Sequence, residues 1–410
     1  MRGSALMDQL FRTSAGRIVA VLTRRLGPEH LDLAEDAVQD AVLRALETWP
    51  YRGQPENPAG WLMQVARNRA LDRLREAAVR DRHHAALMAE WADDPPTDDD
   101  AGDAELRLLL LCCHPSLPSR SRVALALKTV GGFGVGEIAR AFLAQPSAVA
   151  QILVRAKRSL REAEVAFDLP SDQALHDRIE SALETLYLMF NEGYSATAGE
   201  QVVREDLCVA AIRLAQLLAA NPLTARPALL ALLALMHLQG SRLRSRTDRS
   251  GDLLLLADQD RAGWDQPMIA AGLAWLGRSA AGDEETIYHL EAAIAACHAV
   301  APDVERTDWV RVLSLYDQLL QAKPTPVVRL NRAVALGRVH GPRAALAALD
   351  GLEAHPAMRR YAWFPAARAV FLEASGDREA SAVALRRAMD LAGTEPERRL
   401  LGERLSRLLR

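Results

Sequence analysis

Apolar residues recur at helical spacing along almost the whole chain. The stretch LDLAEDAVQDAVLRALETWP carries one such stripe, formed by Ala34, Val38, Ala41, Ala45 and Trp49. No segment combines sustained apolar and polar alternation with the β-branched residues that are typical of strands. The pattern therefore predicts an all-α protein.

Two breaks divide this helical pattern. WADDPPTDDDAGD, residues 91–103, has six acidic residues and two prolines, a composition that cannot bury itself and favours an exposed linker. In FDLPSDQALHDR, residues 167–178, Pro170 predicts a helix end, and Ser171 or Asp172 can cap the next helix. We expect units at residues 1–90, 105–166 and 171–410, with an acidic linker at 91–104.

The C-terminal part shows a repeat of helix pairs. NRAVALGRVHGPRAALAALDGL is echoed by AARAVFLEASGDREASAVALRRAMDLA, so that Gly341 and Gly376 are 35 residues apart, as are Ala345 and Ala380. This spacing is close to the ~34-residue period of tetratricopeptide repeats. Because AAIAACHAVAP and YDQLLQAKP resemble second helices of similar pairs, the pattern predicts an α-solenoid. A generic helical bundle is the alternative.

Charge is uneven along the chain, although the net charge is only −3. Residues 118–163 hold eight Lys or Arg against Glu137 and Glu162, and residues 61–82 hold six arginines against three acidic residues. Local basic clusters of this kind favour phosphate binding even in a mildly acidic protein.

The first basic cluster lies on the predicted helix WLMQVARNRALDRLREAAVR. Asn68, Asp72 and Arg75 share one face of it, while Leu62 and Val65 can pack inward. A face with an amide, a carboxylate and guanidinium groups can bond to base edges and phosphates. A solvated helix with internal ion pairs is the simpler alternative.

The second basic cluster contains a helix-turn-helix pattern. GEIARAF predicts a short helix, LAQ a turn, and Pro146 the start of a longer helix to about Ala163. The N-terminal residues of the second helix would face bases, and its later basic residues would reach phosphates. Two amphipathic helices without a DNA-binding role are the alternative.

Together these elements resemble an extracytoplasmic-function sigma factor of the sigma-70 family. The resemblance rests on LAEDAVQDAVLRALETWP, NPAGWLMQVARNRALDRLR, the acidic linker and EIARAF...PSAVAQILVRAKRSLRE, in that order. TLYLMFNEGY, LADQDRAGWD and LAGTEPERRLLGERL resemble the group with a long C-terminal tetratricopeptide-like extension. The resemblance implies a region 2 helical bundle, a helix-turn-helix region 4 and a C-terminal solenoid.

The resemblance also implies partners and site residues. Core RNA polymerase, through its β′ clamp helices and β subunit, would contact Asp36, Gln39 and Asp40. The −10 promoter element would be read and opened by Trp61, Arg67, Asn68, Asp72 and Arg75. The −35 element would be contacted by Ser147, Ala148, Gln151, Arg155, Lys157 and Arg158. Many members carry Thr at the position of Ala148 and a basic residue at that of Ile152, so the −35 surface departs from the family pattern.

The extension, residues 171–410, is expected to bind a regulatory partner or to control the sigma core in cis, because solenoids present concave surfaces. The resemblance suggests a small DGPF-like or YCII-like protein as partner and no membrane anti-sigma protein. Phe190 and Tyr194 of FNEGY are expected to pack, with Gly193 ending their helix.

The remaining chemistry predicts no catalytic centre, metal site or cofactor. Cys112, Cys113, Cys208 and Cys297 are too irregularly spaced for a disulfide framework. Without an apolar run long enough for a bilayer or a leader sequence, we expect a cytoplasmic protein. A polymerase-independent DNA-binding regulator with a helical-repeat sensor is the alternative function. An enzyme using Glu192, Asp258, Asp260 or Asp265 is a weaker one, because capping explains such acids more simply.

Overall fold

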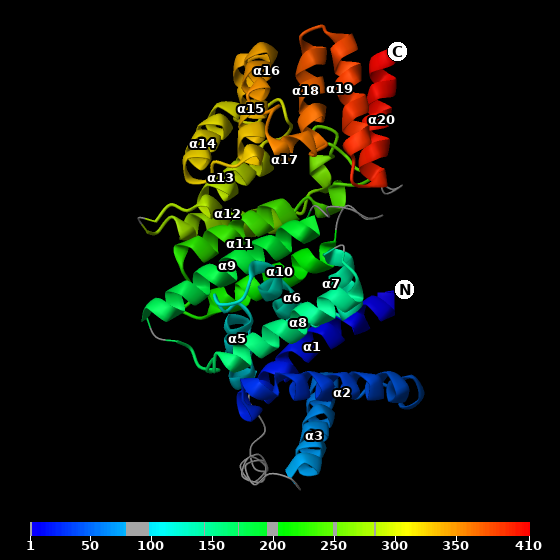
Figure 1. The fold of residues 1–410 in the computed structure, drawn as a ribbon, viewed down its shortest axis with the longest axis vertical. Coiled ribbons are helices and arrows are strands. Elements are labelled where there is room, and N and C mark those ends of the chain that lie inside the picture. The colour runs from blue at the N-terminus through cyan, green and yellow to red at the C-terminus, as the bar shows by residue number, and fades with distance from the viewer. Residues whose placement is uncertain are drawn as a thin grey trace. The chain divides into compact units, whose positions relative to one another are not determined.

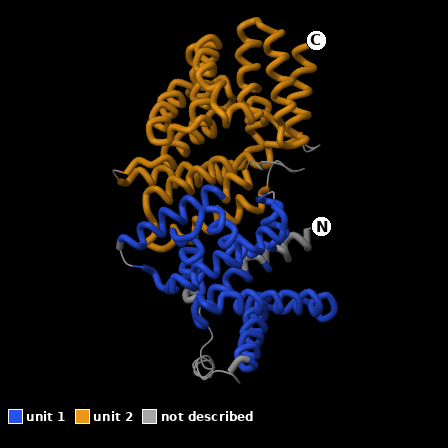
Figure 2. The backbone as a smooth tube through the Cα atoms, in the orientation of Figure 1, with its two compact units in different colours: residues 1–188 blue, residues 189–410 orange. Residues whose placement is uncertain are grey.

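The computed structural model describes residues 2–78, 98–142, 144–170, 172–194, 204–248, 252–282 and 284–410. In these ranges the chain is helical and has no β-strand, only an isolated antiparallel bridge between Thr247 and Leu253. The predicted all-α class is confirmed. The chain forms two compact units, residues 1–188 and 189–410, coloured separately in Figure 2.

The first three long helices of unit 1 are α1 (Arg2–Leu26), α2 (Leu31–Arg52) and α3 (Pro58–Ala78), with a short 3-10 turn, η1 (Pro28–His30), before α2. Helices α2 and α3 pack against each other and against α1. Gly53 ends α2 with φ +80°, a conformation that L side chains rarely adopt, and its N–H donates to the Trp49 carbonyl. The predicted apolar stripe of α2 is buried throughout.

The second half of unit 1 holds α5 (Asp98–Cys112), α6 (Ser119–Thr129), α7 (Val135–Ala141) and α8 (Pro146–Glu162). Helices α7 and α8 pack together as the expected helix-turn-helix. Of the predicted linker, residues 91–97 lie outside the described residues, whereas residues 98–104 are helical. Ala101 and Ala104 are buried, because α5 packs along α1. The expectation of an exposed linker, which rested on the acidic composition, is therefore wrong for residues 98–104.

Helix α1 makes an unusually close contact with α6. A Cβ atom added to Gly16 would lie 2.1 Å from the Val130 carbonyl oxygen. Only a residue without a side chain permits this approach. The two halves of unit 1 are thus packed closely at the described residues of α1, α5 and α6.

Helix α9 (Asp172–Tyr194) begins where the sequence predicted a new helix, but its first part belongs to unit 1. Arg122 of α6 bonds to the Glu184 carboxylate at 2.5 Å and also to the Ser181 hydroxyl. Ile179 and Leu183 are buried. The compact units divide between Leu188 and Met189, inside the helix, whereas the extension was expected to begin at residue 171.

Unit 2 is a succession of packed helices, as predicted for a solenoid. They are α10 (Glu205–Ala220), α11 (Pro227–Gly240), α12 (Gln266–Ser279), α13 (Ile287–Val300), α14 (Trp309–Ala322), α15 (Pro326–His340), α16 (Pro342–Asp350), α17 (Pro356–Arg359), α18 (Trp363–Ala374), α19 (Arg378–Leu391) and α20 (Glu395–Leu409). Each long helix from α10 to α16 packs on the next, and α18, α19 and α20 stand side by side in Figure 1. Short 3-10 turns at Leu243–Ser245 and Arg261–Gly263 precede α12.

The repeated glycines mark equivalent turns. Gly341 separates α15 from α16 and Gly376 separates α18 from α19, and both have φ +88°. Small residues allow close helix packing nearby, since a Cβ atom on Gly337 would lie 2.4 Å from the Phe371 ring. The helix pairs are confirmed, and their relation to tetratricopeptide repeats stays a prediction.

Helix α11 is apolar on all sides and is the centre of the first half of unit 2. It contacts α10, α12 and α13, which bury nearly every residue of PALLALLALMHLQG. A helix that is apolar all round requires burial in a core or a bilayer. Across the described ranges, no helix has both the length and the apolar character needed to cross a membrane.

Candidate nucleic-acid and polymerase interface

Helix α2 presents its acidic residues away from its buried stripe. Asp36 and Gln39 are exposed and Asp40 is partly exposed. The stripe from Ala34 to Trp49 fixes the rotation of the helix, since its residues recur at helical spacing and pack on α1 and α3. The three residues predicted to bind polymerase are therefore close together on the accessible side of one helix.

The same helix holds a second acidic pair that the sequence analysis did not single out. Asp32 and Glu35 both accept hydrogen bonds from the Lys157 ammonium group of α8, at 2.6 Å and 2.7 Å. Arg161 lies 3.4 Å from Asp32. The Lys157 and Glu35 side chains are only 12% and 8% exposed. Helix α8 is thus tied to α2 by a partly buried ion-pair cluster.

Electrostatics favour the charged form of Lys157 in this cluster. Burial disfavours the ammonium, but Glu35 and Asp32 together outweigh this cost and raise the pKa of Lys157. The second carboxylate oxygen of Glu35 is buried and has no hydrogen-bond partner. Glu35 therefore depends on Lys157 for its main compensation, and the pair would be costly to break from one side.

Helix α3 carries the residues predicted for the −10 element. Asn68, Asp72 and Arg75 are all exposed on it, with Arg75 paired to Asp72 at 3.2 Å. Asn68 accepts a hydrogen bond from the Gln64 amide at 3.2 Å. Because these contacts are exposed and lie within one helix, they hold the side chains only weakly and leave them available to a partner.

Trp61 and Arg67, at the other predicted −10 positions, are partly buried. The Trp61 ring contacts the Trp49 ring edge-on, with centroids 5.5 Å apart. This contact fixes the start of α3 against the end of α2. Trp61 thus has a packing role in addition to its predicted contact with DNA.

The residues near the start of α8 form an exposed surface. Ser147, Ala148 and Gln151 are exposed, as is Arg155 one turn later. The helix is positioned by Val149, Leu153, Ala156 and Leu160, which are buried against α6 and α7. Arg158 is also exposed and pairs with Glu162 at 2.6 Å. Ser147, Gln151, Arg155 and Arg158 provide polar side chains of the kinds that contact base edges and phosphates.

Lys157 is the exception among the predicted −35 residues. The structure places its ammonium group on Asp32 and Glu35, so it does not lie with the exposed side chains of α8. The sequence offered a faint signal, namely two acids three residues apart and two bases four residues apart, each pair on one helical face. Nothing in a single sequence indicates that pairs over 100 residues apart meet.

Two of the four acidic residues considered for an enzymatic site, Asp260 and Asp265, cap helices. Asp260 accepts from the Ala262 N–H and Asp265 caps α12 by accepting from the Met268 N–H. Phe190 and Tyr194 stack with their centroids 5.8 Å apart, as expected for packing.

The neighbouring cysteines are buried thiols. Burial raises the pKa of Cys113 to about 12 and that of Cys112 further. Cys112 also lies 2.9 Å from the Thr129 hydroxyl. No group of three His, Cys, Asp or Glu side chains within the described residues is arranged to hold a metal ion.

Comparison with protein families gives three matches along the chain. Residues 10–80 match Sigma-70 region 2, and residues 107–160 match Sigma-70, region 4. Residues 178–280 match a family of unknown function (DUF6596). The first two matches contain the α2, α3 and α8 surfaces, and the third begins inside α9.

The chain is also similar to curated proteins. An uncharacterised protein of Rhizobium meliloti (strain 1021) is 42% identical over 330 residues, which are 79% of this chain and 78% of the relative. A protein of Mycobacterium tuberculosis named "Probable ECF RNA polymerase sigma factor SigI" is 29% identical over 244 residues, 54% of this chain and 82% of the relative. No solved structure matches the chain.

Proposed function

We propose that the chain is a sigma factor of the extracytoplasmic-function group with an additional C-terminal domain, which directs core RNA polymerase to promoters in the following way. Its matches to Sigma-70 region 2 and Sigma-70, region 4 and its similarity to a probable extracytoplasmic-function sigma factor support this proposal. The acidic face of α2 binds the β′ clamp helices through Asp36, Gln39 and Asp40. The order of region 2 and region 4, each with an exposed polar helix face, carries this proposal.

Promoter reading is divided between two helices. On α3, Asn68, Asp72 and Arg75 contact the −10 element, with Trp61 and Arg67 beside them. On α8, Ser147, Ala148, Gln151, Arg155 and Arg158 contact the −35 element. Strand opening needs no hydrolysis, because capture of an extruded base can repay its unstacking, which costs a few kcal/mol.

In the described form of unit 1, the ion pairs of Lys157 with Asp32 and Glu35 join α8 to α2. We call this arrangement the closed form. Lys157 cannot contact a DNA phosphate while Asp32 and Glu35 hold its ammonium group. We infer that promoter binding exchanges these carboxylates for phosphates, so the cluster lowers the affinity of the free protein for DNA.

In vitro transcription with purified core polymerase on a genomic library tests the central proposal. We expect selective initiation that requires the full chain. Asp36→Ala should reduce both initiation and copurification with core polymerase, whereas Glu47→Ala, an exposed acid further along α2, serves as the control. DNA binding without any copurification would favour the alternative, a polymerase-independent regulator.

We propose that the C-terminal unit controls this activity in cis or through a small protein partner of the DGPF-like or YCII-like type. Its succession of helix pairs supports such a role, because solenoids expose broad concave surfaces. A chain that ends at Tyr194 keeps α9 whole and removes the rest. If it transcribes like the full chain, with and without the partner, unit 2 has no such role.

A further inference from the structure

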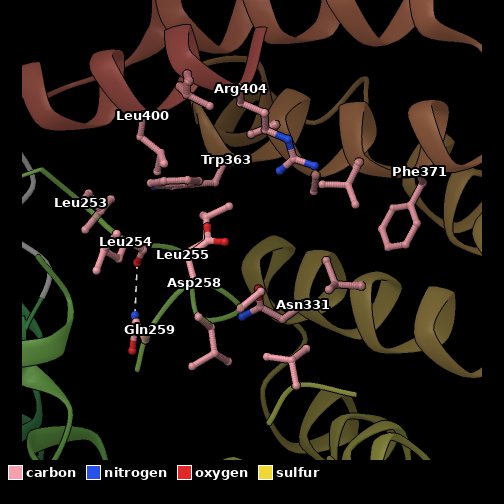
Figure 3. Close-up of a pocket in the computed structure, with 18 of the residues that line it drawn as sticks. Leu253, Leu254, Leu255, Asp258, Gln259, Asn331, Trp363, Phe371, Leu400 and Arg404 are labelled. Carbon is pink, nitrogen blue, oxygen red and sulfur yellow. Dashed lines mark hydrogen bonds between the residues drawn. The ribbon is translucent and has the colours of Figure 1, made fainter. Parts of the chain in front are cut away.

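Unit 2 contains a large cavity that the sigma activity does not explain. It has a volume of about 860 Å³ and lies between the segment of residues 252–259 and helices α15, α18 and α20. Figure 3 shows Leu253 of the segment beside Leu400 and Trp363 at one end of the cavity, and Phe371 at the other end. The volume falls within the ~300–1,000 Å³ range of small-molecule sites.

The chain's own segment covers part of this space, which stays partly open to solvent. Leu253 packs with Leu400, while Leu255 and Trp363 join the same cluster. Asp252 pairs with Arg399 of α20 at 2.5 Å. Since residues 252–259 already lie along the helices, an extended peptide has no continuous path there. The remaining space suits a compact occupant.

The lining is rich in arginine. Arg242, Arg246, Arg338, Arg404 and Arg407 line the cavity against only two acidic residues, Asp258 and Glu373. Glu373 lies 3.8 Å from Arg404. Among the described residues, Arg242, Arg338 and Arg407 have no ion pair. The cavity therefore carries positive charge that the protein itself does not neutralise.

Aromatic rings hold two of these arginines in place. The Arg242 guanidinium lies 5.5 Å from the Tyr194 ring centre and 6.0 Å from that of Trp264. Arg338 lies 5.4 Å from the Trp309 ring centre. A guanidinium stacked on a ring keeps its N–H groups at its edge, where they can donate to an acid group.

We propose that this cavity binds an amphipathic organic anion of small-molecule size. Its acid group is held by Arg242 and Arg338, and its apolar body lies against Leu255, Trp363 and Phe371. Guanidinium groups prefer carboxylate, sulfonate or phosphate oxygens, and the apolar wall supplies the remaining contact area. The site lies wholly within unit 2 and does not depend on the sigma function.

Two fluorescent probes of similar shape test the site on the full chain. 8-Anilino-1-naphthalenesulfonate carries an anionic group, and N-phenyl-1-naphthylamine lacks it. We expect saturable binding of the anionic probe with a 1:1 stoichiometry. Arg242→Gln and Arg338→Gln should each weaken it about tenfold, with little change for the neutral probe. Arg329→Gln, an exposed arginine on the same helix as Arg338 that lies outside the cavity, is the matched control.

A cavity-filling variant tests whether the probes occupy the cavity, independently of its charge. Val334→Trp, which places a large ring in the cavity with every arginine intact, should weaken binding of both probes while the helical circular dichroism signal is kept. The proposal is overturned if the anionic probe does not saturate, if Val334→Trp leaves its binding unchanged, or if the arginine variants bind it like Arg329→Gln.

Discussion

Lys157 shows how strongly one side chain can depend on a distant part of the chain. Its neighbours on α8 are exposed, but it is held by Asp32 and Glu35 more than 100 residues earlier. A buried charge such as Glu35 is costly without a partner. The contact therefore stabilises the association of α8 with α2 and withholds a basic group from DNA.

Removing the acceptors of Lys157 should increase DNA binding by the free protein. With Asp32→Asn and Glu35→Gln combined, Lys157 and Arg161 become available to phosphates, and we expect several-fold tighter binding to duplex DNA with a steeper salt dependence. The measurement is fluorescence anisotropy at several salt concentrations, without polymerase. The control is Asp36→Asn, which removes one charge from the same helix and leaves the contact with α8 intact. The double variant should bind DNA more tightly than this control. Equal affinities would contradict the closed form.

His298 should make unit 2 sensitive to mild acid. Burial, with Arg242 and Arg261 nearby, lowers the pKa of His298 to about 4, and its Nδ1 atom has no hydrogen-bond partner. The unfolded chain takes up a proton near pH 6.5 and the folded chain does not. Stability from this group is therefore fully present above about pH 6.5 and is lost as the pH falls towards 4.

The loss should reach at most about 3 kcal/mol. It can be measured by denaturant unfolding at pH 7 and pH 5, comparing the parent with His298→Gln. The variant should lose less stability between the two pH values. His114 and His237, whose pKa values are also lowered mainly by burial, remain in both proteins and cancel in the comparison.

At the scale of elements, local sequence signals predicted helices well and their assignment to units less well. Pro146 begins a helix as expected, and α9 begins at Asp172, within one residue of the predicted cap. Gly341 and Gly376 follow equivalent helices, because caps, prolines and glycines act within a few residues. The start of α5 inside the acidic segment and the packing of α9 on α6 were not predicted. Both depend on tertiary burial of Ala101 and Ile179, which local patterns do not encode.

Helix α9 should be required for the stability of unit 1. A chain ending at Pro170 leaves Arg122, which is 7% exposed, without Glu184 and Ser181, and uncovers an apolar surface. We expect it to be at least about 3 kcal/mol less stable than a chain ending at Tyr194. Thermal denaturation of the two chains checks this.

A point variant isolates the ion pair from the lost surface. In the chain ending at Tyr194, Arg122→Gln should destabilise strongly, whereas Lys128→Gln on the same helix forms the control, since Lys128 has no ion pair in the described structure. If the chains ending at Pro170 and Tyr194 have the same melting temperature, α9 is not part of the folded unit.

At the scale of the whole molecule, sequence motifs predicted two sigma-70 regions in the order in which the family models match them. Most of the predicted site residues on α2, α3 and α8 are exposed, whereas Lys157 is held by Asp32 and Glu35. The cavity of unit 2 could not be predicted. Its arginines come from positions as far apart as Arg242 and Arg404, and no spacing rule connects them. The roles of the individual site residues remain predictions until polymerase and DNA binding are measured.

The contact of residues 252–253 with α20 also has a consequence for how unit 2 unfolds. In an array whose repeats touch only their neighbours, terminal helices can fray one after another. Here Asp252 and Leu253 contact Arg399 and Leu400, a link between residues 147 positions apart. That link ties the last helices to the first half of the unit, so the array should lose its structure in one cooperative step.

Leu253→Ala should uncouple the unfolding of the last helices from that of the first half of unit 2. Leu253 is 6% exposed, and its truncation should cost about 2–5 kcal/mol, most of it at the link. Hydrogen exchange should then show α18–α20 opening before α10–α13, whereas Val383→Ala, at an exposed position of α19, should preserve a single transition. With the link intact, the helix pairs of unit 2 should unfold together and not one pair after another.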